Sequence, residues 1–226
     1  MMMAEATNHY FKHLGVSDGL SQVCIPSIYQ DELGAVWLGT TEGLNRYNGK
    51  DVKVFQPSES NHGLTNNEIN ELCGDKNGRM YIRSGNDLIK LDIYTEQFTC
   101  LRQKGVYGLF CKKDTLWVSC ADGIYYYTGQ GTELTFFARV QKGFVGRALY
   151  VDKETVWVVT RKYLVAISRE DPLRQEILLT LDKGNCILGD SSGNIWVGAW
   201  NGLYRVSPDR ETTAYVSHSG MGELCD

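Results

Sequence analysis

The chain has 226 residues, of which 42% are hydrophobic and 22% are charged, an ordinary balance for a globular protein. A formal net charge of −4 without a basic cluster argues against a nucleic-acid-binding surface. No apolar run approaches the roughly 18 residues of a membrane span, and the 24 glycines and 4 prolines suit a fold with many tight turns.

The first 22 residues precede the regular part of the sequence. Residues 1–6 end in Ala4-Glu5-Ala6, a small-x-small pattern like a signal-peptidase site, but the charged and apolar regions that should come before it are missing. They are interpreted either as a signal-peptide remnant or as a short disordered start. Residues 10–14 are predicted to form a strand, so residues 7–22 are interpreted as an orphan outer strand and a lead into the first repeat.

From residue 23 onward the chain repeats itself five times. Each copy is marked by an aromatic anchor, and successive anchors are 44, 36, 40 and 39 residues apart. The anchors are Trp37, Tyr81, Trp117, Trp157 and Trp196. An aliphatic residue follows each anchor by seven positions, and a large apolar residue follows it by ten. A period near 40 residues is typical of four-stranded propeller blades, and we expect the anchors to pack between neighbouring blades.

The strands of each copy can be placed around the anchor. Three copies have an Asp-x-x-Gly turn before it, starting at Asp31, Asp75 and Asp190, which predicts a tight hairpin. The third and fourth copies lack this glycine, so their turns should differ. The constant spacing after the anchor predicts a short loop between the second and third strands, because one extra residue would reverse the faces of the next strand. Fourth strands are expected at residues 52–55, 97–101, 134–137, 175–180 and 212–216.

These elements predict an all-β protein, a β-propeller of four-stranded antiparallel blades. Its five units span residues 23–60, 61–102, 103–140, 141–182 and 183–216. Residues 217–226 look like the start of a sixth unit. A closed five-bladed ring is possible, but an incomplete arc of a larger, seven-bladed ring explains the sixth lead better.

Catalytic and metal-binding motifs are not evident. None of the seven cysteines forms a Cys-x-x-Cys pair, and the four histidines are scattered, so no metal or cofactor site is expected. Buried thiols are favoured over disulfides, since an odd number of cysteines cannot all pair within one chain. No nucleophile elbow or phosphate-binding loop is present.

Candidate binding residues lie in or beside the loops between second and third strands, at one mouth of the expected central channel. Trp200 breaks the repeat and could stack on a sugar ring, with nearby polar side chains bonding hydroxyl groups. Cationic loop residues could meet an acidic glycan. The candidates are Trp200, Asn201, Arg161, Lys162, Asn86, Asp122 and Arg83. The alternatives remain open that Trp200 packs against a neighbouring blade and that the charged residues are merely solvated.

The first unit also carries a family resemblance. Gly19-Leu20-Ser21-Gln22, Gly34, Trp37-Leu38-Gly39-Thr40 and the run from Gly43 to Tyr47 closely resemble the two-component regulator propeller repeat. The fifth unit, with Asp190, Gly193, Trp196 and Gly202, is similar, while the three middle units match less well. The resemblance implies two seven-bladed propellers, a β-sandwich, a membrane span, a histidine kinase and a response regulator, so this chain would be a truncated N-terminal part of such a protein.

The resemblance further implies a periplasmic sensor of glycans that regulates transcription. The expected function is therefore a non-enzymatic module that binds an oligosaccharide or holds a homodimer interface, with the missing blades and kinase region as partners and no nucleic-acid contact of its own. A propeller enzyme, such as a polysaccharide lyase or glycosidase, and a pure scaffold remain as alternatives.

Overall fold

The protein folds into five separate four-stranded antiparallel sheets, each a simple meander. The computed structural model describes residues 12–57, 63–102, 104–141 and 144–215. The sheets contain β1 (Ser27–Gln30) to β4 (Val52–Phe55), β5 (Ile69–Gly74) to β8 (Gln97–Arg102), β9 (Val106–Lys112) to β12 (Thr135–Ala138), β13 (Gly146–Val151) to β16 (Gln175–Thr180), and β17 (Cys186–Gly189) to β20 (Thr212–Tyr215).

The second and third strands of each sheet surround the loops predicted from the anchor spacing. They are β2 (Val36–Thr40) and β3 (Gly43–Tyr47), β6 (Arg79–Ser84) and β7 (Asp87–Asp92), β10 (Thr115–Cys120) and β11 (Gly123–Tyr127), β14 (Thr155–Thr160) and β15 (Tyr163–Ser168), and β18 (Ile195–Ala199) and β19 (Gly202–Val206).

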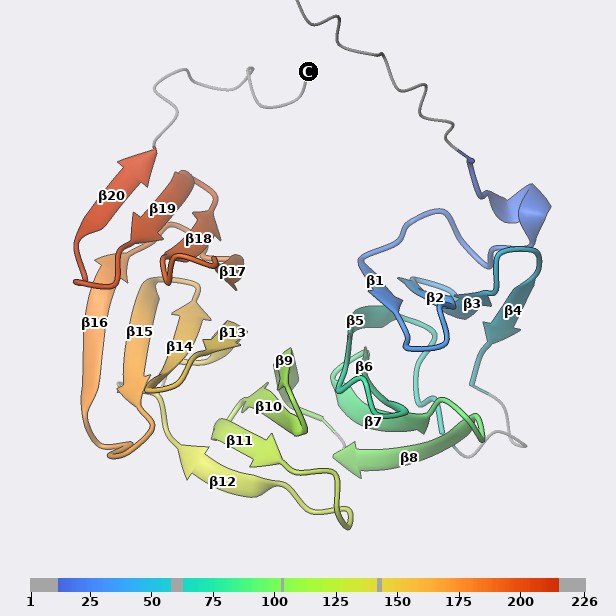
Figure 1. Cartoon of the computed structure of the whole chain (residues 1–226), viewed down its shortest axis with the longest axis horizontal. Coiled ribbons are helices and arrows are strands. Elements are labelled where there is room, and N and C mark those ends of the chain that lie inside the picture. The colour runs from blue at the N-terminus through green and yellow to red at the C-terminus, as the bar shows by residue number, and fades with distance from the viewer. Residues whose placement is uncertain (1–11, 58–62, 103, 142–143, 216–226) are drawn as a thin grey trace, which may run out of the picture.

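The five sheets stand side by side in an arc (Figure 1), with the first strands β1, β5, β9, β13 and β17 on its inner side. The predicted all-β propeller architecture is confirmed. Residues 1–11 and 216–226, which include the expected signal-peptide remnant and the start of a sixth unit, lie outside the described residues.

The anchors fill the spaces between successive sheets. Trp37 is fully buried against the second sheet, and Tyr81 is fully buried against the third. Trp117 and Trp157 are 5% and 6% exposed and contact the fourth and fifth sheets respectively. The prediction that anchors pack between blades is confirmed for these four. Trp196 lies on the outer face of the last described sheet, where it is half-buried and stacks on Tyr215 at a centroid distance of 5.8 Å.

The aspartates of the turns do more than close a hairpin. The Asp31 carboxylate accepts the Ala35 backbone N–H at 2.8 Å and the Trp37 indole N–H at 2.8 Å, so one side chain fixes both turn and anchor. The same indole bond joins Trp196 to Asp190 at 2.8 Å. It also joins Trp157 to Asp152 at 2.6 Å, although the fourth copy has lost the turn glycine. The third turn differs, as expected: Lys113, in the left-handed region at φ 51°, forms a two-residue turn.

The N-terminal segment corrects one prediction. Residues 12–14, the described part of the strand predicted at residues 10–14, are not in a strand and are followed by a short 3-10 turn, Val16–Asp18. The segment is held instead by side chains: Leu20 is 2% exposed, and the Ser21 backbone N–H donates to the Asn45 side-chain oxygen at 2.9 Å. The segment is therefore attached to the first sheet through the side chains of Leu20 and Asn45, and not through the strand pairing that was expected.

Gly43 allows the close approach of β4 at the loop after the first anchor. Its φ of +124° is in the region that favours glycine, and a Cβ there would lie 2.7 Å from the Phe55 carbonyl oxygen. A side chain at position 43 would therefore clash with β4, which lies directly against the end of the two-residue loop between β2 and β3.

We expect Gly43→Ala to lower the free energy of unfolding by about 2 kcal/mol, combining backbone strain with the clash. Gly34→Ala is the matched control, because Gly34 also has a positive φ but a Cβ added there would meet no atom within 4 Å. It should cost about 1 kcal/mol. If urea denaturation gives equal losses of unfolding free energy for the two variants, the approach of β4 to Gly43 does not contribute to the loss.

Candidate functional site

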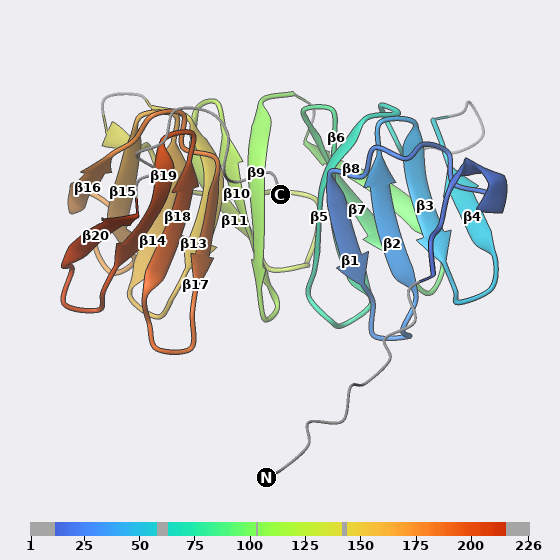
Figure 2. The ribbon, with the colours of Figure 1, turned by 90° about the horizontal axis from the view of Figure 1, so that it is seen from above.

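The loops between second and third strands all lie on one side of the arc, opposite the turns between first and second strands (Figure 2). Backbone hydrogen bonds tie them to the segments that cross from sheet to sheet: Gly43 N–H donates to Asn67 O at 2.8 Å, and Trp200 N–H donates to Asp182 O at 2.9 Å. We call this side the loop face. Its backbone is fixed by these bonds, so side chains there have a rigid support.

Two adjoining hollows open on the loop face over the third, fourth and fifth sheets. Their volumes are about 370 and 410 Å³, and both are lined by Arg147 and Arg161. The first is completed by Tyr107, Phe144, Val145, Thr160 and Lys162, and the second by Lys183, Asn185, Cys186, Gly198, Ala199 and Trp200. We call the two together the cationic groove.

The charge of the groove has one sign. Arg147, Arg161, Lys162 and Lys183 line it, and among the described residues no carboxylate does. None of the four takes part in an ion pair within the described residues. In a chain with a formal net charge of −4, this grouping concentrates positive potential at one place. The groove is therefore suited to an anionic ligand.

Aromatic side chains complete the groove. Trp200 is 78% exposed, so within the described residues it does not pack against a neighbouring sheet. Lys183 Nζ lies 4.7 Å from the Trp200 ring centroid. Phe144 is held against Tyr163 at a centroid distance of 4.8 Å, and Tyr107 is 37% exposed. An exposed indole beside unpaired cations offers both a stacking surface and anion contacts.

The structure brings together only some of the predicted site residues. Trp200, Arg161 and Lys162 line the groove, whereas Asn201 is exposed on the same loop but outside the lining. Asn86 is exposed near the second sheet and also lies outside it. Asp122 is engaged elsewhere: it pairs with Arg102 at 2.7 Å and accepts the Tyr125 hydroxyl at 2.8 Å.

Arg83, the remaining predicted residue, contacts its own surroundings. Its Nε lies 3.4 Å from the Glu71 carboxylate, which also accepts the Leu109 backbone N–H at 3.1 Å. Burial raises the pKa of the Glu71 carboxyl to about 7, against the opposing effect of Arg83. Arg83 therefore bridges parts of the second sheet beside its interface with β9 and is not free to meet a ligand.

This carboxyl makes stability depend on pH. Because the folded pKa of Glu71 is above its unfolded value of about 4.3, the native state holds more protons between these values, and the unfolding free energy falls as pH rises from about 4.3 to about 7. We expect Glu71→Gln to be more stable than wild type at pH 8 by about 1–2 kcal/mol. This gain is smaller than the full pKa shift would give, because the Glu71 side chain is 30% exposed and solvent screens its charge. Denaturation at pH 5 and pH 8 measures this; Glu176→Gln, at an exposed ion pair, is the control.

Arg147, Lys183, Tyr107 and Phe144 were not predicted as site residues. Arg147 reaches the groove because the pairing of β13 with β14 shifts between Gly146 and Ala148, which leaves Arg147 without a partner residue in the ladder. Such a bulge redirects a side chain. The position of a bulge depends on packing between strands, so the anchor spacing carries no signal for it.

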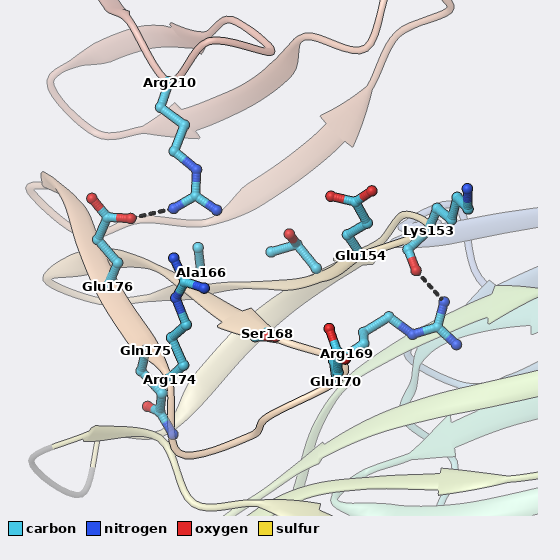
Figure 3. Close-up of a pocket in the computed structure, with 11 residues that line it drawn as sticks. Lys153, Glu154, Ala166, Ser168, Arg169, Glu170, Arg174, Gln175, Glu176 and Arg210 are labelled. Carbon is cyan, nitrogen blue, oxygen red and sulfur yellow. Dashed lines mark hydrogen bonds and ion pairs between the residues drawn. The ribbon is translucent and has the colours of Figure 1, made fainter.

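A hollow of about 440 Å³ lies at the opposite side of the arc, between the fourth and fifth sheets (Figure 3). Its charges are mixed and partly satisfied: Arg210 pairs with Glu176, and the Arg169 guanidinium donates to the Asp152 and Lys153 carbonyl oxygens at 3.0 Å each. Glu154 and Glu170 also line it. These contacts hold turns together, so we do not regard this hollow as the primary site.

Metal clusters and membrane-spanning helices are both missing from the described part of the chain. Among these residues, no group of three or more His, Cys, Asp or Glu side chains is placed to hold a metal ion. Over the same residues there is no helix long and apolar enough to cross a membrane.

Comparison with known proteins confirms the expected resemblance. Residues 19–42 match the family model described as "Two component regulator propeller". A stretch of 55 residues is 38% identical to a protein named histidine kinase P4 from Formosa agariphila, covering 24% of this chain and 4% of that protein. The chain thus carries a two-component regulator propeller repeat.

Solved structures share the fold. An extracellular domain attributed to a hybrid two-component system of B. thetaiotaomicron superposes with a TM-score of 0.78 at 23% identity, over 89% of this chain and 31% of that one. Virginiamycin B lyase from Staphylococcus aureus gives a TM-score of 0.67 at 12% identity, over 87% of this chain and 71% of that one. The chain therefore spans about a third of the extracellular domain and a small part of the kinase that it resembles.

Proposed function

We propose that this chain is a non-enzymatic, ligand-sensing propeller region of a two-component signalling protein, and that it binds an anionic oligosaccharide in the cationic groove. The proposal places the chain in the periplasm, as part of a sensor that regulates transcription. The observation that carries it is the groove itself, which in the described residues is lined by four cations, an exposed indole and no carboxylate. The propeller repeat at residues 19–42 supports the signalling role.

The chemistry of the groove favours a sugar that bears carboxylate or sulfate groups. An arginine guanidinium presents paired N–H donors that match two oxygens of such a group, and Arg147 and Arg161 line both hollows. The face of Trp200 offers an apolar surface for the C–H face of a pyranose ring. A neutral sugar would use the indole but would leave the cations without partners.

The enzyme alternative rests on the shared fold of the lyase. Lyases and glycosidases need a positioned acid or base, and the described residues that line the groove include neither a carboxylate nor a histidine. Among the described residues of the lining, the side chains that could exchange a proton are those of Tyr107, Cys186 and the two lysines. Fold similarity alone does not supply a reaction.

The scaffold alternative rests on a different surface. Leu188 on β17 and Leu203 on β19 are 65% and 42% exposed, and they share the outer face of the last sheet with Trp196. An apolar face of this kind is suited to a further sheet or to a second copy of the chain. This alternative needs no ligand in the groove, and sedimentation of the purified chain would reveal a dimer directly.

Calorimetric titration against a panel of oligosaccharides tests the proposal. The panel pairs uronic-acid or sulfated oligomers with neutral oligomers of equal length, and each mixture is then assayed for new reducing ends. We expect binding heat for acidic oligomers only, weakening as salt is raised, and no new ends. New reducing ends would instead support the enzyme alternative, and no heat across the panel would support the scaffold.

A further inference from the structure

Two cysteines from different sheets meet between the second and third sheets. Cys73 lies on β5 and Cys111 on β9, and their sulfur atoms are 3.1 Å apart. This distance is about 1 Å longer than the bond of a disulfide, about 2.05 Å. Both residues are free thiols in the structure. The two side chains already point at each other across the interface, so a bond between them needs only a small approach.

The surroundings hold the pair in place. Both cysteines pack against the cluster of buried apolar residues that joins the two sheets, which includes Tyr81 and Leu109. Among the described cysteines no other two sulfur atoms are in contact: Cys24 and Cys186 are exposed, Cys100 is half-buried and Cys120 is buried. The proximity of Cys73 and Cys111 is therefore specific to this interface.

We propose that Cys73 and Cys111 are a modification site at which a disulfide covalently joins the second and third sheets. A thiolate of one cysteine attacks a protein or small-molecule disulfide, forming a mixed disulfide and releasing one thiol. The thiolate of the other cysteine then attacks the first cysteine's sulfur and displaces the second thiol. Two protein thiols are oxidised, the oxidant disulfide is reduced to two thiols, and the two protons pass to these leaving groups.

The bond would have a clear physical effect. It would close a loop of about 38 residues, which restricts the unfolded chain. It would also prevent the second and third sheets from separating. Burial raises the pKa of the Cys73 thiol well above its ordinary value, so attack requires transient opening of the interface and oxidation should be followed over hours. The inference does not depend on the cationic groove.

Peptide mapping of the full chain tests this proposal. Reduced protein is incubated with oxidised glutathione, alkylated, digested and analysed by mass spectrometry, with Cys73→Ser, Cys111→Ser and Cys24→Ser as variants. We expect a linked peptide containing Cys73 and Cys111 in wild type and in Cys24→Ser, and in neither of the other two. The midpoint of thermal unfolding should rise by roughly 5–10 °C on oxidation and return on reduction.

The proposal fails if, after incubation with oxidised glutathione, Cys73 and Cys111 are recovered only in alkylated form while the exposed Cys24 and Cys186 carry glutathione. It also fails if the linked peptide joins a different pair. Because the map of wild-type protein decides between these results, a serine variant that does not fold leaves the test intact.

Discussion

Replacing Trp157 by alanine should lower the free energy of unfolding by about 3–5 kcal/mol, the largest loss that we expect from a single substitution. Trp157 is 6% exposed and fills the space between the fourth and fifth sheets, where it contacts apolar residues of both. Its indole N–H also donates to Asp152 at 2.6 Å. Alanine would leave a cavity that two rigid sheets cannot close. Urea denaturation followed by circular dichroism measures the loss.

Trp196→Ala is the matched control. Trp196 occupies the same place in its repeat and has the same type of indole bond, to Asp190 at 2.8 Å. It lies on the outer face of the last described sheet, and Tyr215 is its one aromatic neighbour among the described residues. We expect it to cost about 1–2 kcal/mol, since little new cavity forms. Equal losses for the two variants would mean that packing between sheets is not what the anchors contribute.

Reversing two charges in the cationic groove should abolish most of the binding to an acidic oligosaccharide. We expect Arg147→Glu combined with Arg161→Glu to weaken affinity by about 100- to 1000-fold, because both side chains line both hollows and each change replaces an attraction by a repulsion. The thermal midpoint should change little, since neither arginine has an ion-pair partner in the described structure. Calorimetric titration gives the affinities.

Arg174→Glu is the control for this prediction. Arg174 lines the hollow at the opposite side of the arc, so its reversal changes the net charge without altering the groove. It should reduce affinity by less than about threefold through the change in net charge alone. A similar loss in the control and in the groove variant would show that binding follows net charge and not this site.

The architecture could be predicted because its main cause is periodic. Every sheet must bury an aromatic against the next, so Trp37, Tyr81, Trp117 and Trp157 recur at the same place in their blades. The interval from Trp37 to Leu44 is constant because a loop of two residues separates β2 from β3, and Gly43 lets it close against Phe55. Because an aromatic residue is buried at the same place in successive sheets, it recurs at a regular interval that can be read from the sequence.

The groove could be predicted only in part. Trp200 breaks the pattern of the repeat, and its loop between the second and third strands brings it to the groove. Arg147 depends on a bulge in β13, and Lys183 lies in a crossover segment whose path is set by neighbouring sheets. The predicted Asp122 lies in one of the loops of the loop face, but its carboxylate is held by Arg102. Spacing locates a loop, whereas the direction of each side chain depends on contacts between sheets.

The indole bonds and the cysteine pair are two further contacts that the sequence analysis did not predict. The bond from Trp37 to Asp31 spans six residues and recurs in the fifth unit, so the spacing of aspartate and tryptophan could have predicted it. The aspartate was assigned a turn role alone. The contact of Cys73 with Cys111 joins two weakly matching units, and no spacing rule connects them. The strand predicted at residues 10–14 was wrong over residues 12–14 because the segment that follows them docks on the first sheet through side chains without strand pairing.

A crystal structure of the chain with an acidic oligosaccharide tests the central claim most directly. The account predicts a sugar ring stacked on Trp200 and acidic groups within hydrogen-bonding distance of the Arg147 and Arg161 guanidinium groups. A glycan bound in the hollow lined by Arg210 and Glu176, or bound on the loop face without contact to either arginine, would contradict it.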